Sequence, residues 1–348
     1  MKTTSPTRAA RRGRTARAAG QTVLITGADT FWGRQVASAL AAEPGIGRLV
    51  LLADESTGLK PRRSRTLRMD PRDPEIEQIL RREKVDTVYH LDYAETYRRN
   101  EEVFDRNIIG TLTVLAACAV AKVRKVIVRS SQMVYGAHFN NPTYLSERRT
   151  LRGKHHLPYL RDLCDLERYV AETRAKQPQM CITLVRLAHV VGPQCHSPLM
   201  RYLRMSRAPV LAGFEPLFQV IHESDAVDAL VQAHRVDVSG PVNVGPDGVL
   251  PLMKMLRLAH TRTLPVLHPI AYAAAEWLRG IPPFGTVPLE IDYLRYTCMG
   301  DNARMKKALG FQPQLASDEA FVKAVAESRP VRLRNPGEDG PEDGESGI

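Results

Sequence analysis

The chain has 348 residues, of which 43% are hydrophobic and 25% charged; this is the composition of an ordinary globular protein and excludes a fibrous or low-complexity one. Its formal net charge is +11, and its five cysteines are scattered without a C-x-x-C pair. The cysteine pattern is typical of reduced thiols in the cytoplasm and argues against a disulfide framework or a zinc site.

Charge is unevenly distributed along the chain. Residues 1–20 hold one Lys and five Arg without an acidic residue, and residues 335–348 hold five acidic residues without a basic one. Neither end shows apolar periodicity, so we expect a disordered basic tail over 1–20 and a disordered tail over 329–348 that is acidic at its end. The basic tail lacks the apolar run of a secretory signal, and we expect no transmembrane segment.

Short β-branched runs alternate with helical patterns from residue 22 onward. Strands are predicted at 22–27, 48–54, 66–70, 86–92, 125–131, 181–188 and 241–245. The segments between them place apolar residues three and four positions apart, which is the spacing of one helix face. Strands that are apolar throughout, each followed by a helix, predict an α/β protein with a doubly wound parallel sheet, the Rossmann fold.

The first strand leads into the stretch "TGADTFWGRQVASAL", which predicts a tight turn and a helix. A dinucleotide site needs glycines in such a turn for the sharp bend and for the approach of the pyrophosphate, which then meets the helix N-terminus. Asp54 ends the second strand 21 positions after Gly33, close to the spacing of about 20 expected for a carboxylate on the adenosine ribose. This carboxylate favours NAD over NADP, although Lys60, Arg62 and Arg63 lie just downstream.

Eight segments follow one another along the chain: "TGADTFWG", "MDPRD", "VDTVYHLD", "RNIIGTL", "VRSSQMVYG", "VRLAHVVGP", "VIHESDAVDAL" and "DNARMKKALGFQP". Together they resemble the motifs of an extended short-chain dehydrogenase/reductase of the NAD-dependent epimerase/dehydratase family, and they are similar to actinobacterial proteins loosely labelled UDP-glucose epimerases. The resemblance implies bound NAD, transient hydride transfer on a nucleotide-sugar or similar hydroxyl substrate, and a homodimer.

The resemblance also implies site residues. Cofactor contacts are expected from Gly27, Thr30, Phe31, Trp32, Gly33, Asp54, Asp70, Leu91 and Asn107. Ser131 would be the catalytic hydroxyl on its strand and Tyr159 the general acid/base. No metal site is expected.

The lysine that the family places four residues after the tyrosine is Leu163 in this chain. Residues at i and i+4 share a helix face, so a lysine there would stabilise the phenolate. An unassisted tyrosine, with a pKa of about 10, is phenolate in only about one molecule in a thousand at pH 7. Two alternatives stay open: the basic run 154–156 replaces the lysine, or Tyr144 with Arg148 is the functional pair.

Other departures from the family pattern are Thr30 in the turn, Asp92 and Tyr93 in place of small residues, His189 in place of an asparagine, and Phe218 in place of an arginine that binds a substrate diphosphate. The sequence is therefore compatible with an oxidoreductase or isomerase, and with a catalytically impaired NAD-binding sensor or scaffold. Nucleic-acid binding rests mainly on charge and is disfavoured, because only 6% of the residues are aromatic and they form no recognisable stacking platform.

The pattern becomes irregular and rich in proline after residue 193. We therefore expect an NAD-binding domain over 21–192, to which 218–245 return, and a smaller substrate lobe over 193–217 and 246–328. The apolar run at 264–278 contains His268, Pro269 and Glu276, which predicts a buried helix of this lobe rather than a membrane span.

Overall fold

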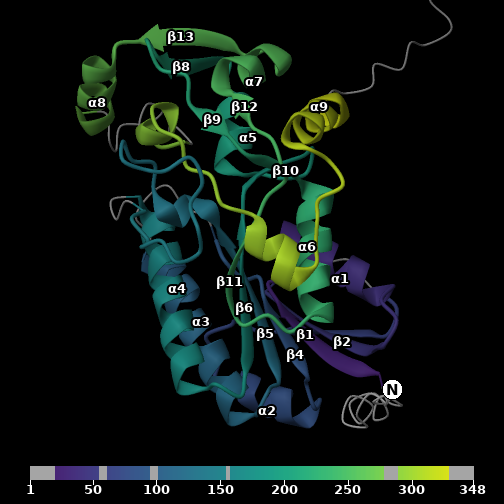
Figure 1. Cartoon of the computed structure of the whole chain (residues 1–348). Coiled ribbons are helices and arrows are strands. Elements are labelled where there is room, and N and C mark those ends of the chain that lie inside the picture. The colour runs from purple at the N-terminus through teal and green to yellow at the C-terminus, as the bar shows by residue number, and fades with distance from the viewer. Residues whose placement is uncertain (1–19, 55–60, 95–100, 154–156, 278–288, 329–348) are drawn as a thin grey trace, which may run out of the picture.

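A parallel sheet forms the centre of the computed structural model, which describes residues 20–54, 61–94, 101–153, 157–277 and 289–328 (Figure 1). In the described chain this sheet has seven strands in the order β11-β6-β5-β4-β1-β2-β3. Every neighbouring pair is parallel. The strands are β1 (Gln21–Thr26), β2 (Ile46–Ala53), β3 (Ser64–Arg68), β4 (Thr87–His90), β5 (Lys125–Ser131), β6 (Cys181–Leu187) and β11 (Gly240–Val244).

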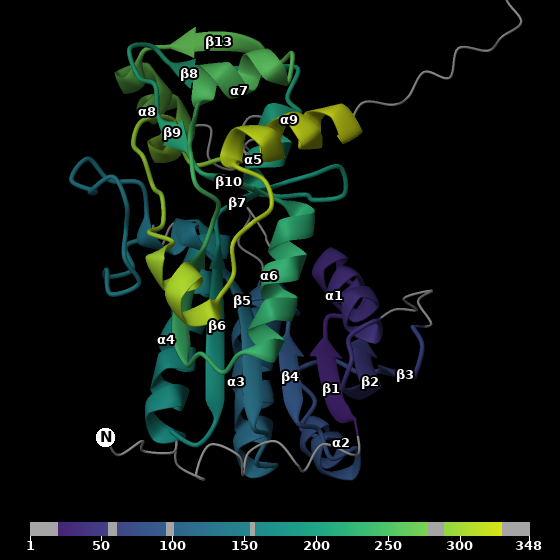
Figure 2. The same ribbon diagram turned by 45° about the vertical axis from the view of Figure 1, so that its right-hand side comes forward.

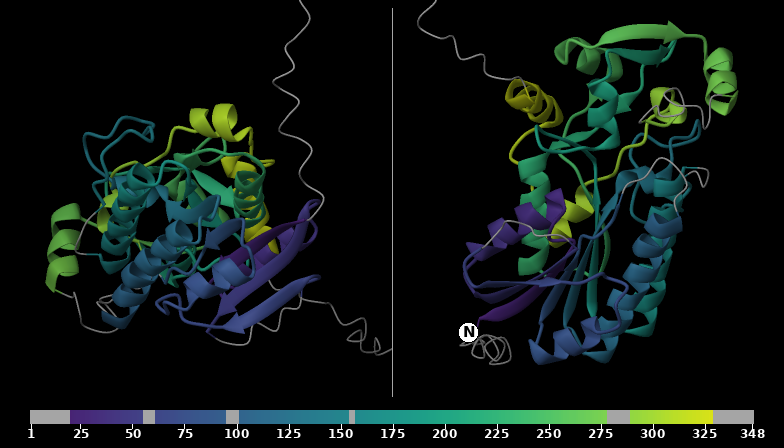
Figure 3. Two further views of the ribbon diagram at one scale, coloured as in Figure 1. Left: turned by 90° about the horizontal axis from the view of Figure 1, so that it is seen from below. Right: turned by 180° about the vertical axis from the view of Figure 1, so that it is seen from behind.

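Helices cover both faces of the sheet (Figure 3). One face carries α1 (Phe31–Ala41) and α6 (Glu223–Arg235), and the other carries α2 (Ile76–Arg82), α3 (Glu101–Val120) and α4 (Pro158–Lys176). The central strands are buried on both sides, because alternate side chains enter two separate apolar clusters, Ile25 on the α1 side and Leu24 on the α3 side, whereas the edge strand β3 is partly exposed. The doubly wound parallel sheet predicted from the sequence is confirmed.

The strand order reverses between β1 and β4. The chain leaves β1 toward β2 on one side, whereas β4 continues toward β5 on the other. The loops that follow these two strands therefore diverge and open a crevice at the carboxyl edge of the sheet, where ligands bind in folds of this kind.

A smaller lobe lies beyond this carboxyl edge (Figure 2). It contains three two-stranded pairs: β7 (His189–Val191) with β10 (Val220–His222), β9 (Leu217–Phe218) with β12 (Leu250–Pro251), and β8 (Arg207–Leu211) with β13 (Arg262–Val266). Its helices are α5 (Pro198–Leu203), α7 (Leu252–Leu258), α8 (His268–Trp277) and α9 (Ser317–Ser328). Three single turns complete the described elements: η2 (Gln132–Tyr135), η3 (Ile291–Leu294) and η4 (Met305–Leu309).

The structure corrects the expectation of one buried helix over 264–278. Residues 264–266 belong to β13, the helix α8 begins at His268, and Leu264, Leu267 and Ile270 are exposed. Pro265 and Pro269 explain the late start, because a proline inside a helix removes a hydrogen bond and clashes with the preceding turn. The two predicted tails lie outside the described residues, apart from Gly20.

Within the described residues, one helix has the length and composition to cross a membrane, and it is α3. In the fold α3 packs between α2 and α4, and it buries Ile108, Val114 and Leu115 in the cluster that covers the sheet. The buried side of α3 is therefore part of the core, although Ile109 and Val120 are exposed.

Candidate functional site

The turn between β1 and α1 is closed by Thr30. Its hydroxyl donates to the Gly27 carbonyl oxygen at 2.7 Å and accepts from the Gly33 amide at 3.0 Å, which caps the helix. Gly27 has a φ of +65°, and a Cβ there would lie 2.7 Å from the Asp92 Cα. A Cβ on Gly33 would lie 2.0 Å from the Gly27 carbonyl oxygen. The turn thus requires glycine at both positions, and the threonine between them replaces a third glycine by supplying a cap.

An ion-pair network lies beside this turn, at the ends of β2 and β4. The Arg106 guanidinium donates to both Asp92 carboxylate oxygens, each at 2.9 Å, and also to Asp54. The Asp29 carboxylate accepts from the Asp54 amide at 3.2 Å, which connects the turn to the end of β2. Burial raises the pKa of Asp92, and Arg106 opposes that rise. Burial alone would lower the pKa of Arg106, but the two carboxylates raise it instead.

These residues border a cavity of about 410 Å³. Among its described lining residues are the carboxylates of Asp29, Asp92 and Glu102, and the cation of Arg106. Asp54 pairs with that same arginine, so Arg106 binds two carboxylates, those of Asp54 and Asp92. We call this cavity the acidic cavity.

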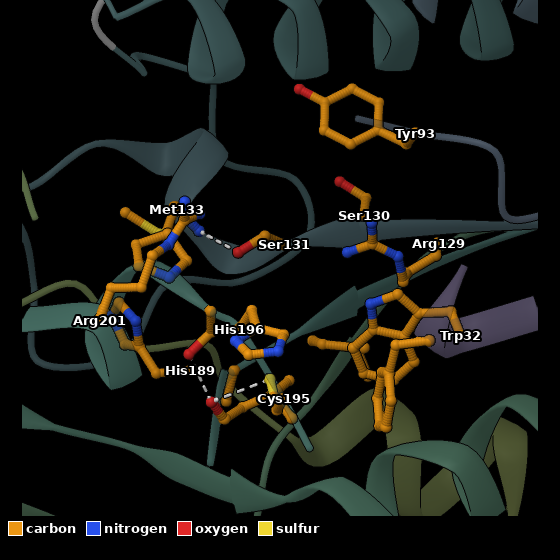
Figure 4. A pocket seen from close by; sticks show the side chains of 16 residues that line it. Trp32, Tyr93, Arg129, Ser130, Ser131, Met133, His189, Cys195, His196 and Arg201 are labelled. Carbon is orange, nitrogen blue, oxygen red and sulfur yellow. Dashed lines mark hydrogen bonds between the residues drawn. The ribbon is translucent and has the colours of Figure 1, made fainter. Parts of the chain in front are cut away.

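A second cavity, of about 290 Å³, lies on the other side of the turn, between the end of β5 and α5 (Figure 4). We call it the basic cavity, because none of its described lining residues is Asp or Glu. Three kinds of side chain define its chemistry: aromatic Phe31, Trp32 and Tyr93, hydroxylic Ser130, Ser131 and Ser197, and basic Arg129, Arg201, His189 and His196. Tyr93 lines both cavities, so the two are neighbours.

Arg129 lies within the basic cavity between two aromatic rings. Its guanidinium carbon is 5.1 Å from the centre of the Trp32 ring and 5.8 Å from that of Tyr93. The arginine shares a strand face with the buried Ile127, two positions earlier, and so points toward α1, where Trp32 resides. A cation stacked on aromatic faces in this way is stabilised by about 0.5–2 kcal/mol.

The two serines at the end of β5 have different partners. Ser130 donates to the Glu167 carboxylate on α4, which in turn forms a buried ion pair with Arg186 at 2.5 Å. The Ser131 hydroxyl accepts from the Met133 amide at 3.2 Å and caps η2. The structure therefore places the predicted catalytic hydroxyl in the basic cavity, on a strand end that a buried ion pair anchors.

Tyr159 lies elsewhere. Its side chain is 3% exposed and packs in the apolar cluster of the smaller lobe with Met133, Tyr135 and Leu160, and it is not among the described residues that line either cavity. Its backbone carbonyl accepts a hydrogen bond from the Tyr93 hydroxyl. Leu163, at the position of the missing lysine, is 5% exposed in the cluster that covers the sheet.

Of the remaining predicted cofactor residues, Asp70 and Leu91 follow the ends of β3 and β4, and Asn107 lies on α3. Asn107 is fully buried on α3 and binds the Ala94 amide and carbonyl at 2.9 and 3.0 Å, so it fixes the loop after β4. Asp70, after β3, is paired with Arg72, which lowers its pKa. Leu91 is fully buried at the end of β4.

Two departures of the sequence lie side by side in the smaller lobe. The rings of Phe218 and His189 are 5.2 Å apart, and His189 also meets Tyr293 edge-on. Burial lowers the pKa of His189 to about 4, so its imidazole is neutral at pH 7. Of the alternative pair Tyr144 and Arg148, Tyr144 is half exposed and is not among the described residues that line either cavity. The basic run 154–156 lies outside the described residues.

Sequence reasoning missed Arg106, Arg129 and Arg201. Arg129 had a detectable signal, because a charged residue interrupts the otherwise apolar strand "KVIVRSS". Arg106 directly precedes Asn107 but matches no motif, and Arg201 belongs to the irregular part of the chain, where periodicity carries no information.

The geometry fits a dinucleotide at its adenosine end. The α1 N-terminus faces the crevice at the strand-order reversal, and such a terminus attracts a pyrophosphate. Asp54 stands at the end of β2 with a carboxylate able to accept from ribose hydroxyls, although it shares that carboxylate with Arg106. The cavities on the two sides of the turn lie where the two halves of such a ligand would extend.

Comparisons with known proteins agree with this geometry. The model of the family described as "NAD dependent epimerase/dehydratase family" matches residues 23–245. Uncharacterised proteins of Mycobacterium tuberculosis H37Rv and of Mycobacterium bovis are 32% identical over 308 residues, which is 86% of this chain and 82% of theirs.

Solved structures with the same fold include enzymes of nucleotide-sugars. A UDP-glucose 4-epimerase from Thermotoga maritima, with UDP-glucose, has a TM-score of 0.69 at 19% identity, covering 88% of this chain and 98% of that one. A dTDP-glucose 4,6-dehydratase from Bacillus anthracis, in complex with NAD, has a TM-score of 0.68 at 12% identity, covering 88% and 96%. At these identities the likeness shows the fold alone.

Proposed function

Because the chain belongs to the NAD-dependent epimerase/dehydratase family, we propose that it binds NAD, and a hydroxylated ligand such as a nucleotide-sugar, without using the family's tyrosine–lysine pair. It would act as a binding or sensing module. One observation carries the proposal: Tyr159 and Leu163 are buried in two apolar clusters, whereas Ser131 lines the basic cavity. Tyr159 is not among the described residues that line the cavity of Ser131.

The acidic network supports NAD over NADP. Among the described residues, the carboxylates of Asp54 and Asp92 share the single guanidinium of Arg106. A 2′-phosphate would add about two more negative charges to this side of the turn and be repelled, whereas ribose hydroxyls can donate to Asp54. When bound, NAD would supply a nicotinamide able to accept hydride, and the chain's own contribution is to hold the pyrophosphate at α1 and the ribose at Asp54.

The residues at the family's catalytic positions support binding without the usual proton transfer. A phenol needs a nearby cation to become a base at pH 7, and the side chain four residues after Tyr159 is apolar.

A second candidate is an oxidoreductase with a relocated tyrosine. Tyr93 lines the same cavity as Ser131, and the Arg129 cation is 5.8 Å from the centre of its ring. In this candidate Tyr93 replaces Tyr159 as the proton donor once its hydroxyl leaves the Tyr159 carbonyl oxygen, and Arg129 replaces the lysine.

We also propose that the protein is cytoplasmic and forms a homodimer. All five cysteines are free thiols, four of them buried, which suits a reducing compartment. Ile109 and Val120 on α3 are about half exposed, which suits a helix face that packs on a second copy. Light scattering on purified protein tests the dimer.

The functional test is to incubate the protein with NAD⁺ and UDP-glucose, UDP-glucuronate or dTDP-glucose. Absorbance of reduced nicotinamide and chromatography of the sugar nucleotides are the readouts. We expect NAD⁺ binding without reduction or product. Turnover that Tyr93→Phe removes would establish the second candidate, and turnover that only Tyr159→Phe removes would contradict both.

A further inference from the structure

The end of the smaller lobe farthest from the large sheet is a two-stranded ribbon of β8 and β13 (Figure 1, Figure 2). In its parallel register Arg262 lies opposite Arg207. Ala208 and Val210, the alternate residues of β8, are buried in the apolar cluster of this lobe. Because side chains alternate between the two faces of a strand, Arg207, Arg262 and Leu264 share the outer face of the ribbon.

Apolar side chains are concentrated where β13 passes into α8. The exposed fractions of Leu264, Leu267 and Ile270 are 49%, 61% and 59%. The two prolines between them are exposed as well, so apolar side chains face solvent at most positions of 264–270. A single exposed leucine is ordinary, but a contiguous group of this kind marks a binding surface. We call residues 264–270 the apolar tip.

Positive charge surrounds the apolar tip. The segments 192–214 and 248–275, which contain β8 and β13, hold six Lys or Arg residues and no Asp or Glu. Arg207 and Arg262 are exposed on the ribbon, and neither forms an ion pair with a described residue. An apolar group beside such cations is complementary to an anionic lipid surface, where aliphatic side chains enter the headgroup region and Arg meets lipid phosphates.

The edges of the ribbon disfavour a β-strand of another protein as its partner. Among the described strands, β8 and β13 pair only with each other, and each contains a proline, Pro209 and Pro265. A proline has no N–H group to donate, so it interrupts the hydrogen-bond ladder that an added strand would form. At a lipid surface the same prolines are tolerated, since they bring no N–H group that would lose its hydration.

We propose that the apolar tip, with Arg207 and Arg262 beside it, docks on the surface of an anionic lipid membrane. Leu264, Leu267 and Ile270 enter the headgroup region, and the two arginines bind lipid phosphates. The protein stays peripheral, because the tip is far shorter than the roughly 20 apolar residues of a membrane span. The described linings of the two cavities beside the first turn contain no residue of the tip, so membrane docking and dinucleotide binding are separate properties.

The test is sedimentation of the full chain with vesicles of phosphatidylcholine alone and with vesicles of equal parts phosphatidylcholine and phosphatidylglycerol. We expect the partition coefficient to be at least about tenfold higher for the anionic vesicles, and to fall as salt is added. No sedimentation with the anionic vesicles, or equal partition into vesicles of both compositions, would overturn the proposal.

Apolar variants separate the tip from charge elsewhere in the chain, because the one Lys and five Arg of residues 1–20 can attract anionic vesicles by charge alone. Leu267→Ser should lower the partition coefficient about fivefold, and adding Ile270→Ser should lower it further by a similar factor. Val322→Ser, on a side chain of α9 that is 51% exposed, is the matched control and should bind like the unmodified chain. Equal partition of Leu267→Ser and Val322→Ser would show that the tip does not dock.

A charge variant tests the arginines of the ribbon. Arg262→Gln should lower the partition coefficient for the anionic vesicles about fivefold and leave that for phosphatidylcholine unchanged. Arg68→Gln, on an exposed arginine of the edge strand β3, is the charge-matched control and should have no effect. An equal loss in both variants would mean that net charge, and not the ribbon, attracts the lipid.

A second copy of the chain is the alternative occupant of the tip, and light scattering distinguishes it. We expect Leu267→Ser/Ile270→Ser to have the same molecular mass in solution as the unmodified chain. If these substitutions convert a dimer into a monomer and the unmodified chain does not sediment with anionic vesicles, the tip is an interface between copies and the proposal is wrong.

Discussion

Single side chains decide what the crevice can do, and their directions matter as much as their identities. Ser131 was correctly expected at the end of a strand, and the structure places it in a cavity. Tyr159 was expected on a helix, and it is on one, but the helix turns its phenol into an apolar cluster. A sequence gives the position of a residue on an element, whereas the rotation of that element about its axis depends on the packing of distant segments.

The first turn supplies a prediction at this scale. Gly27→Ala should abolish dinucleotide binding, because its Cβ would lie 2.7 Å from the Asp92 Cα in addition to the strain of a φ of +65°. Gly213→Ala is the matched control, with a φ of +85° and nothing within 4 Å of its Cβ. The control should cost about 1 kcal/mol of stability and keep its affinity for NAD⁺ in calorimetry. Unchanged binding by Gly27→Ala would disprove the role of the turn.

Restoring the family's lysine is the second prediction. Leu163→Lys should lower the free energy of unfolding by about 4 kcal/mol or more, because a lysine amine loses its hydration in an apolar cluster. Leu163→Met should change it by less than about 1.5 kcal/mol. Urea denaturation measures both. A stable Leu163→Lys protein that gains turnover would show that α4 can present this position to the cavity.

At the scale of elements, the sheet was predictable and the smaller lobe was not. The predicted strands differ from those of the large sheet by at most two residues at either end, because apolar β-branched runs between helices leave few alternatives. The short pairs β7–β10, β9–β12 and β8–β13 join segments that are distant in sequence and carry no periodic pattern. Arg201 escaped notice for the same reason.

The junction of α4 with β5 and β6 gives the third prediction. Glu167 and Arg186 form a buried bidentate ion pair, and the Ser130 hydroxyl also donates to Glu167. Glu167→Gln therefore leaves a buried cation without its anion. The free energy of unfolding should fall by about 3–5 kcal/mol. Glu172→Gln, exposed on the same helix, should change it by less than about 0.5 kcal/mol. Equal effects in denaturant titrations would mean that the pair does not anchor the strand end.

At the scale of the whole molecule, buried imidazoles predict loss of stability in acid. Burial lowers the pKa of His90 and His189 to about 4, below the value of about 6.5 in an unfolded chain. The unfolded state then binds more protons between these values, so stability falls as the pH drops from 6.5 toward 4. Each histidine accounts for about 2 kcal/mol between pH 7 and pH 5.

Because burial raises the pKa of Asp92 and so acts in the opposite direction, the comparison of variants is the informative measurement. Between pH 7 and pH 5, the free energy of unfolding of His189→Asn should fall by about 2 kcal/mol less than that of the unmodified chain. The exposed His196→Asn should follow the unmodified chain. If the free energy of unfolding depended on pH in the same way in all three proteins, the His189 imidazole would become charged in the folded state as readily as in the unfolded one, which contradicts the prediction.

The central claim is that the crevice binds NAD through the first turn and Asp54, and calorimetric titration with NAD⁺ and NADP⁺ tests it most directly. We predict that NAD⁺ binds at least tenfold more tightly than NADP⁺, and that Asp54→Ala removes most of this preference. Absence of binding by either dinucleotide, or equal affinity for both in the unmodified chain, would contradict the account.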